Sequence, residues 1–451
     1  MKRIIRRTGL LVLVLSLSVA CSGDTQGLTD TGVADTSLEA CDSSRTPVVM
    51  VHGFLGAGDN FGWHTMRFTA NGYCPESLFV FDWNSIEQVD HTPELAAFMV
   101  EVLAQSGAEK VDLIGHSAGG TLSYAFLETE EHAAWVRRYV HIDSGVKDTL
   151  PGPAGDVPTL ALWAEIALEL PGTDPNGEGN VREIPGAENV MLPGSDHYSA
   201  ATSEDSFAAI YSFLNDGEAP KTTAFVPEEP VMVAGRALSF GENAPLAGGI
   251  VEVHTYDPQT GIRSSEGPVL SVSTDDEGFW GPVQVESGVH YEFWIQPQGE
   301  GEMVVHYFPA PFVRSNPFFY LRTMPPPTSI TGLLLGVLPR TAEAANMIVF
   351  MQRRILNAAS DELWIDGHQI ATPAVASLEQ STVALFLYDS DEDGVSDLTS
   401  VPMFEQFPFL KGLDIFLSSA PQRGIPVQLN DYALTVPSVP SEQGAMVLML
   451  P

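Results

Sequence analysis

The sequence predicts two structural halves: a mostly parallel β-sheet flanked by helices, and after it an all-β half of one or two sandwich or barrel units. In residues 45–216, continuous apolar runs typical of strands buried on both faces alternate with helical apolar patterns. In residues 231–451, short strands recur with Gly, Asn and Asp turns between them. The chain has 451 residues, of which 44% are hydrophobic, so it has ample material for large cores.

The elements of the first half follow from these patterns. Strands are expected over residues 47–51, 78–81, 110–114, 138–142, 158–163 and 188–192. Helices are expected over residues 95–103, 121–128 and 206–214. Strands that alternate with helices in this order are typical of a parallel, doubly wound sheet.

The second half begins after a linker rich in Pro, Glu and Thr at residues 217–230. The text ALSFGENAPLAGGIVEVHT at 237–255 resembles prealbumin-like modules. We therefore expect a prealbumin-like β-sandwich at 231–300 and a second β-rich unit at 301–451. Strongly apolar segments at 308–312, 318–320 and 330–338 have two interpretations: core strands and domain interface, which we favour, or an exposed lipid-binding surface.

The charge balance excludes several classes of partner. There are 21 Lys and Arg residues against 58 Asp and Glu, a formal net charge of −37. Nucleic-acid binding needs a positive surface, and so does docking on anionic lipid through a basic patch. Three cysteines are too few for a disulfide-rich scaffold or a Cys-rich zinc site.

Residues 1–20 are predicted to be an export signal, because a basic start precedes a short apolar run. The segment Leu17-Ser18-Val19-Ala20-Cys21 resembles a bacterial lipobox, in which the cysteine is acylated. We therefore expect an exported, membrane-anchored bacterial lipoprotein with its N-terminal lipid on Cys21. The alternatives are ordinary signal cleavage, which would give a periplasmic or secreted protein, and a retained anchor.

Residues 21–44 are rich in Gly, Ser, Thr and Asp and are expected to form a flexible tether. With Cys21 acylated, Cys41 and Cys74 remain as a pair. Export allows them to form a disulfide, which we favour over two free thiols.

A catalytic motif lies at the end of the strand at 110–114. Gly115-His116-Ser117-Ala118-Gly119 has the G-x-S-x-G pattern of a nucleophile elbow, and it stands between a strand and a helix, as that motif requires. This context indicates the α/β-hydrolase fold with Ser117 as nucleophile. His197 follows the last strand of the domain, where the general base is expected.

The carboxylate that orients the base has three candidates. Asp143 ends one strand, and Glu165 and Asp174 follow the next, so position alone does not decide between them. The oxyanion donors are expected to be the backbone N–H groups of Ala118, after the nucleophile, and of Phe54, in the loop after the first strand. The candidate triad residues and oxyanion donors all lie before residue 200, so the chemistry itself is expected to need nothing from the β half.

The segments VVMVHGFLGAGDNF (48–61), MRFTANGY (66–73), VDLIGHSAG (111–119) and HAAWVRRYVHIDSG (132–145) resemble the two-domain archaeal lipases that act on long-chain acyl esters. The resemblance implies Ser117, Asp143 and His197 as the triad, with Phe54 and Ala118 as oxyanion donors. It also implies a C-terminal β domain that helps to bind lipid. The segment between Asp143 and His197 does not align, so chain-length preference does not follow from it.

An acidic segment in the β half suggests a calcium site. Residues Asp389, Asp391, Asp393, Val395 and Asp397 have the spacing of a calcium loop with Gly394 at its sixth position. Ser400 stands where an EF-hand has Glu, which excludes a full EF-hand. Two interpretations remain. The segment is either a shorter loop that holds a structural calcium or a solvated acidic hairpin that binds no metal.

These observations predict an exported serine ester hydrolase, a lipase or carboxylesterase, that needs no cofactor for catalysis and acts on lipid or other acyl esters. Two other functions stay open. One is a surface lipoprotein that uses the hydrolase fold and the β domains only to bind lipid or a surface. The other is a hydrolase of polyesters or amides.

Overall fold

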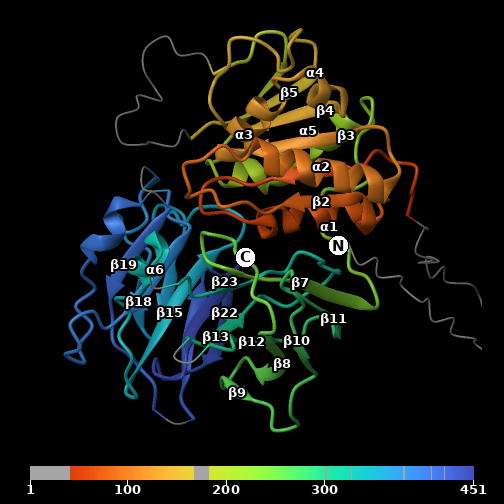
Figure 1. The fold of residues 1–451 in the computed structure, drawn as a ribbon. Helices are drawn as coiled ribbons and strands as arrows, with labels where there is room; N and C mark the ends of the chain where they lie inside the picture. The colour runs from red at the N-terminus through yellow and green to blue at the C-terminus, as the bar shows by residue number, and fades with distance from the viewer. Residues whose placement is uncertain are drawn as a thin grey trace, which may run out of the picture. The chain divides into compact units, whose positions relative to one another are not determined.

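The computed structural model describes residues 41–166, 182–299, 302–326, 328–378, 381–407, 409–420 and 422–451 (Figure 1). The predicted signal, the lipidation site Cys21 and most of the predicted tether lie outside these residues, as does the candidate acid Asp174. Residues 41–451 form one compact unit.

Six strands, all paired in parallel, form the sheet of the first half in the order β2-β1-β3-β4-β5-β6. They are β1 (Val48–Val51), β2 (Leu78–Phe81), β3 (Val111–His116), β4 (Val136–Ile142), β5 (Thr159–Ala164) and β6 (Glu188–Leu192). The strands β1, β3 and β5 are buried at every residue, which explains their uninterrupted apolar sequences. The predicted α/β-hydrolase type of sheet is confirmed.

Helices cover both faces of this sheet (Figure 1). They are α1 (Gly62–Ala70), α2 (Thr92–Ser106), α3 (Ala118–Phe126), α4 (Glu130–Ala134) and α5 (Glu204–Leu214). Apolar residues of α1 and α5 pack on one face, and those of α2 and α3 pack on the other. The sequence did not predict α1, because its buried residues include His64, Thr65 and Arg67 and so follow no apolar period.

The second half is mostly β, as predicted. A ten-stranded mixed sheet contains β10 (Leu270–Ser273), β8 (Ile250–Asp257), β12 (Tyr291–Gln296), β13 (Val305–Phe308), β23 (Ala445–Leu450), β15 (Ala344–Met351), β18 (Ala384–Tyr388) and β19 (Leu410–Asp414), with β9 (Ile262–Arg263) and β20 (Leu417–Ser418) at its sides. A second sheet contains β11 (Phe279–Val285), β7 (Val231–Ser239) and β14 (Leu321–Thr323). A third contains β17 (His368–Gln369), β16 (Leu363–Ile365), β21 (Gly424–Leu429) and β22 (Tyr432–Pro437).

The large sheet continues across the boundary expected at residues 300 and 301, since β13 pairs with β12 on one side and β23 on the other. Two of the three apolar segments are largely internal: Phe308, Phe312, Phe319 and Tyr320 are buried, in agreement with the core interpretation. The third, 330–338, is mixed, since Leu335 and Leu338 are buried but Leu333 and Val337 are exposed. One departure from all-β structure is α6 (Ile330–Leu335), a short helix capped by the Ser329 hydroxyl.

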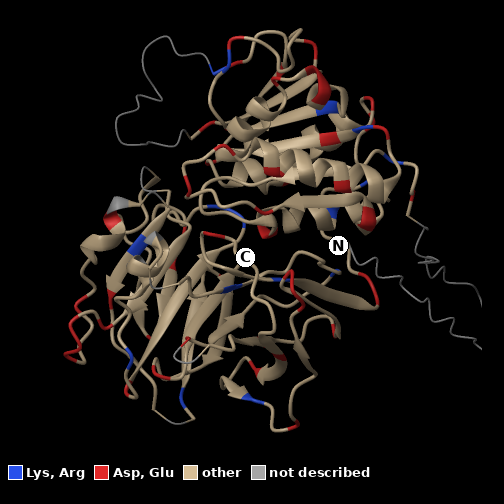
Figure 2. Ribbon diagram, in the orientation of Figure 1, with Lys and Arg blue, Asp and Glu red and all other residues tan. Residues whose placement is uncertain are grey.

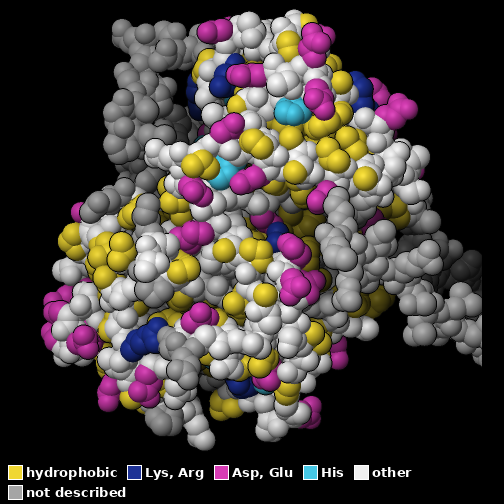
Figure 3. Space-filling view, viewed as in Figure 1, with side chains coloured by type: hydrophobic (Ala, Val, Ile, Leu, Met, Phe, Trp, Pro, Cys, Tyr) yellow, Lys and Arg dark blue, Asp and Glu magenta, His cyan; other side chains and the backbone are white. Residues whose placement is uncertain are grey.

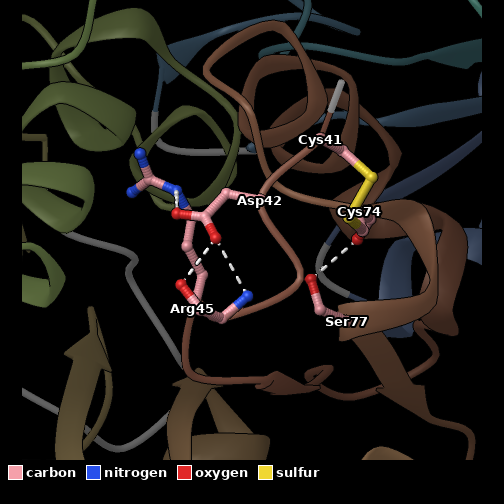
Figure 4. Close-up of a disulfide and its surroundings, with 6 residues drawn as sticks. Cys41, Asp42, Arg45, Cys74 and Ser77 are labelled. Carbon is pink, nitrogen blue, oxygen red and sulfur yellow. Dashed lines mark hydrogen bonds and ion pairs between the residues drawn. A yellow bond between two sulfur atoms is a disulfide. The ribbon is translucent and has the colours of Figure 1, made fainter. Parts of the chain in front are cut away.

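A disulfide joins Cys41 to Cys74 (Figure 4), so the favoured pairing is confirmed. It links the segment that leads into β1 to the turn that leads into β2, across a sequence separation of 33 residues. The Ser77 hydroxyl donates a hydrogen bond to the Cys74 carbonyl oxygen at 2.7 Å and holds that turn. A cross-link of this loop length restricts the unfolded chain and stabilises the fold by about 3–4 kcal/mol in the chain-entropy model.

The acidic side chains are spread over both halves (Figure 2). On the face shown in Figure 3 they are interspersed with apolar and uncharged side chains. Among the described residues, no helix combines the length and the apolar character needed to cross a bilayer.

Candidate active site

Ser117 occupies the sharp turn between β3 and α3, with φ 55° and ψ −124°, a strained conformation for a residue with a side chain. Two glycines allow the close packing around it. A Cβ on Gly119 would lie 2.2 Å from the Val51 carbonyl oxygen, and one on Gly53 would lie 2.8 Å from Ser117 Cβ. Gly119 therefore lets α3 approach the end of β1, and Gly53 lets the loop after β1 approach the serine.

Asp143 and His197 form a buried pair. The distance from His197 Nδ1 to Asp143 Oδ2 is 2.6 Å, and both side chains are nearly inaccessible to solvent. Asp143 follows β4 in a left-handed conformation, with φ 38°. Because Nδ1 is engaged by the carboxylate, Nε2 is the ring nitrogen of His197 that is available to a nucleophile.

The other carboxylate oxygen of Asp143 is also held. Oδ1 accepts hydrogen bonds from the Ala164 N–H at 3.0 Å and from Arg182 Nη1 at 3.1 Å. Burial acts to raise the pKa of Asp143, but His197, the Ala164 N–H and Arg182 together hold this pKa below its usual value. The carboxylate is thus kept ionised and fixed in direction.

Of the two competing acids, the structure describes Glu165. Its side chain is exposed, and its Oε2 accepts a hydrogen bond from the Gly194 N–H at 2.6 Å, so the carboxylate is used to hold the turn before His197. Asp143 is the acid that contacts the imidazole.

Two other histidines near the serine are buried and neutral. Burial, with the proximity of His197, lowers the pKa of His116 to about 3, and its Nε2 lies 3.0 Å from the His197 carbonyl oxygen. Burial likewise lowers the pKa of His52 to about 4. His52 Nδ1 lies 2.8 Å from the Gly53 carbonyl oxygen, which can only accept, so Nδ1 carries the proton.

Ser117, His197 and Phe54 line one cavity of about 1180 Å³, counting the space at its open mouth. The opposite wall comes from the β half, and most of its residues are apolar. They include Val305, Met324, Leu335, Ile348, Phe350, Val383, Ala384, Phe386, Phe409, Leu410, Val447 and Met449. The two halves therefore enclose a largely apolar space beside the serine.

Several residues that contact this site were not predicted from the sequence. Phe409 of the β half stacks on the His197 ring with centroids 5.9 Å apart. Arg182 lies in the segment that could not be aligned, and Asn243 and Arg322 of the β half bind the loop after β1. No local pattern marks these residues, because each reaches the site from a distant part of the chain.

The acidic segment after β18 is arranged differently from the predicted calcium loop. Carboxylate oxygens of Asp389 and Asp391 lie close to that of Asp414, at the end of β19. Asp393 and Asp397 are not in this group; Asp393 instead accepts the Val395 N–H at 2.8 Å. Three converging carboxylates suit a hard cation, and a structural calcium stays a prediction.

Comparison with protein families finds similarity to lipases in both halves. Residues 45–130 match the model of the class 2 lipases. Residues 229–326 match the model of the lipase C-terminal domain, which extends past the boundary expected at residue 300. A further model of a C-terminal domain matches residues 336–450.

Individual relatives are similar over part of their length. A triacylglycerol lipase of Vibrio cholerae is 32% identical over 168 residues, which are 36% of this chain and 51% of the relative. A triacylglycerol lipase of Pseudarthrobacter phenanthrenivorans is 32% identical over 90 residues, 18% of this chain and 28% of the relative. The chain thus spans about half, or less, of the length of these relatives.

Among solved structures, the mature lipase BlEst2 of Bacillus licheniformis covers 39% of this chain and 95% of its own, with 18% identity and a TM-score of 0.32. The naproxen esterase of Bacillus subtilis covers 39% of this chain and 86% of its own, with 14% identity and a TM-score of 0.30. The predicted resemblance to lipases is confirmed by the family matches: the chain is similar to the class 2 lipases in its α/β-hydrolase half and to the lipase C-terminal domain in its β half.

Proposed function

We propose that this chain is a serine ester hydrolase that cleaves long-chain acyl esters. The observation that carries the proposal is the arrangement of one cavity, which is lined by Ser117 at a nucleophile elbow and by His197, itself paired with Asp143. The matches to lipase family models and to triacylglycerol lipases favour an ester as substrate.

The geometry supports a two-step mechanism. Ser117 Oγ attacks the ester carbonyl carbon while Nε2 of His197 takes its proton, and Asp143 stabilises the imidazolium that forms. The N–H groups of Phe54 and Ala118 bind the oxyanion. His197 then protonates the departing alcohol, and water, activated by the same histidine, hydrolyses the acyl-enzyme.

The cavity wall favours long acyl chains. Its β-half side chains are almost all aliphatic or aromatic, and transfer of each methylene from water to such a surface is worth about 0.8 kcal/mol. A short acyl chain leaves most of this wall unused. Rates on esters of increasing chain length should therefore rise beyond butyrate.

The test is a series of p-nitrophenyl esters from acetate to stearate, together with labelling by a fluorophosphonate. Ser117→Ala should lower kcat by on the order of 10⁴-fold and abolish labelling, since triad members act as a unit. Ser271→Ala, at an exposed serine of β10, is the matched control and should keep both. A folded Ser117→Ala variant that keeps the wild-type rate would exclude this serine as nucleophile. An unlabelled, inactive wild type would favour a binding function, and cleavage of amides or polyesters in preference to the esters would redirect the substrate class.

A further inference from the structure

We infer that Asn243 and Arg322 of the β half are positioning residues for the oxyanion hole, so that the β half is required for the chemistry of short esters as well as long ones. The inference rests on the proposed function. The loop 52–56 joins β1 to η1 (Gly58–Phe61) and carries Phe54, the expected oxyanion donor.

Asn243 binds this loop from a turn of the β half that follows β7. Its Nδ2 donates to the Gly56 carbonyl oxygen at 2.8 Å and to the Trp83 carbonyl oxygen at 2.9 Å. The same atom lies 3.3 Å from His52 Nε2. Asn243 is buried and has φ 56°, a left-handed conformation that Asn tolerates better than most residues. One amide thus joins the far end of the loop to the segment after β2.

Arg322, in β14, binds the same loop one residue earlier. Its Nη1 donates to the Leu55 carbonyl oxygen at 3.2 Å, and its Nη2 pairs with Asp59. Burial acts to lower the pKa of this guanidinium, but Asp59 outweighs it and raises that pKa, so the charge is kept. A buried, paired guanidinium has little freedom, and it holds the Leu55 carbonyl in one direction.

The two contacts hold the two residues that follow Phe54. Leu55 has φ 59°, and its N–H donates to the Ser85 hydroxyl at 2.9 Å. A loop in this conformation needs anchors on its carbonyls, since the left-handed region is unfavourable for Leu and an unanchored Leu would relax out of it. Relaxation would turn the peptide planes beside Phe54 and move its N–H away from the oxyanion. Catalysis by such a donor depends on its being fixed before the reaction.

The first test is Asn243→Gly, which removes the amide but suits the left-handed backbone. We expect kcat on p-nitrophenyl butyrate to fall roughly 10- to 100-fold, with KM changed less than about threefold. Removal of a whole oxyanion donor lowers kcat by about 10²–10³-fold, and a displaced donor should cost less. The matched control is Asn430→Gly. Asn430 also has a positive φ, 53°, but binds Asp361 and Glu362 far along the β half.

The second test is Arg322→Lys, which keeps a charge for Asp59 but lacks the second arm that reaches Leu55. Its matched control is Arg314→Lys. Several nitrogens of Arg314 also bind neighbouring residues, namely Thr69, Val226 and Glu228, but these lie away from the loop 52–56, which we call the oxyanion loop. Arg322→Lys should lower kcat in the same way, and Arg314→Lys should not. If Asn243→Gly does not fold, as judged by a thermal melt, this pair decides the question.

The readout that separates positioning from loss of folded protein is inhibition by an alkyl trifluoromethyl ketone. Ser117 Oγ adds to its carbonyl carbon as its proton passes to His197 Nε2, the carbonyl π electron pair moves to oxygen, and the resulting oxyanion occupies the hole. The inhibition constant should rise by the factor by which kcat falls. If the variants show an unchanged inhibition constant and a kcat within twofold of the controls, the inference is overturned. Activity of the wild type in the same assay would still support the proposed function. A wild type without activity or fluorophosphonate labelling would instead overturn the proposed function.

Discussion

At the scale of single residues, the Asp143 carboxylate shows how the fold selects one acid among several. Each of its oxygens has partners: Oδ2 binds His197, and Oδ1 binds the Ala164 N–H and Arg182. Glu165 is close along the chain, yet its side chain is exposed and engaged with the Gly194 N–H. Sequence position made both plausible, and the direction of the left-handed turn at Asp143 separates them.

The expected consequence concerns Asp143→Asn and Glu165→Gln. Asp143→Asn should lower kcat by about 10³–10⁴-fold, because an amide neither fixes the imidazole tautomer nor stabilises the imidazolium. The second, an isosteric control on the neighbouring strand, should lower kcat no more than about threefold. Steady-state kinetics on a short ester measures both. A larger loss in the Glu165 variant would assign the acid to the end of β5.

At the scale of elements, the packing of α3 against β1 determines where Ser117 lies. The helix begins directly after Ser117, and its Gly119 lies against the carbonyl oxygens of Val51 and His52 at the end of β1. A strand–turn–helix sequence is enough to predict the elbow. The closeness of the two backbones is what makes glycine necessary there, and it brings the oxyanion loop beside the serine.

Gly119→Ala should therefore destabilise the protein by about 3 kcal/mol, at the upper end of the range for overpacking. The added Cβ would meet backbone atoms at 2.2 and 2.4 Å, and backbone cannot move aside as a flexible side chain can. Gly145→Ala is the control, because no atom lies within 4 Å of its Cβ position and its φ is not in the left-handed region. Denaturant unfolding compares the two, and equal free energies of unfolding would show that the contact relaxes without cost.

At the scale of the whole molecule, the substrate cavity belongs to both halves. The triad side of the wall comes from the α/β half, and the apolar side comes mainly from the large sheet of the β half. Phe409 even contacts the His197 ring. The β half thus lines the same cavity as Ser117 and His197, whereas the sequence suggested chemistry that needs only the residues before position 200.

A substitution on this wall should change chain-length preference. Ala384→Phe, in β18, would fill part of the cavity and exclude about two methylenes, which corresponds to roughly a tenfold loss on long esters at about 0.8 kcal/mol each. Rates on acetate and butyrate should change little. Ala433→Phe, at an exposed position of β22, is the control for added bulk. Equal losses at all chain lengths in a folded Ala384→Phe variant would remove this wall from the acyl site.

Local sequence determined much of this protein: the parallel sheet, the elbow at Ser117, the position of His197 and the β character of the second half. Those features depend on short-range patterns, such as continuous apolar strands and glycine at tight turns, which neighbouring residues encode. Tertiary structure alone decided that Asp414 joins Asp389 and Asp391, and that Asn243 and Arg322 bind the loop 52–56. Position along the chain left Asp143 and Glu165 both open, the family resemblance implied Asp143, and the structure places Asp143 against the histidine. These contacts join residues far apart in the chain, and only the packing of complete elements brings such residues within hydrogen-bonding distance.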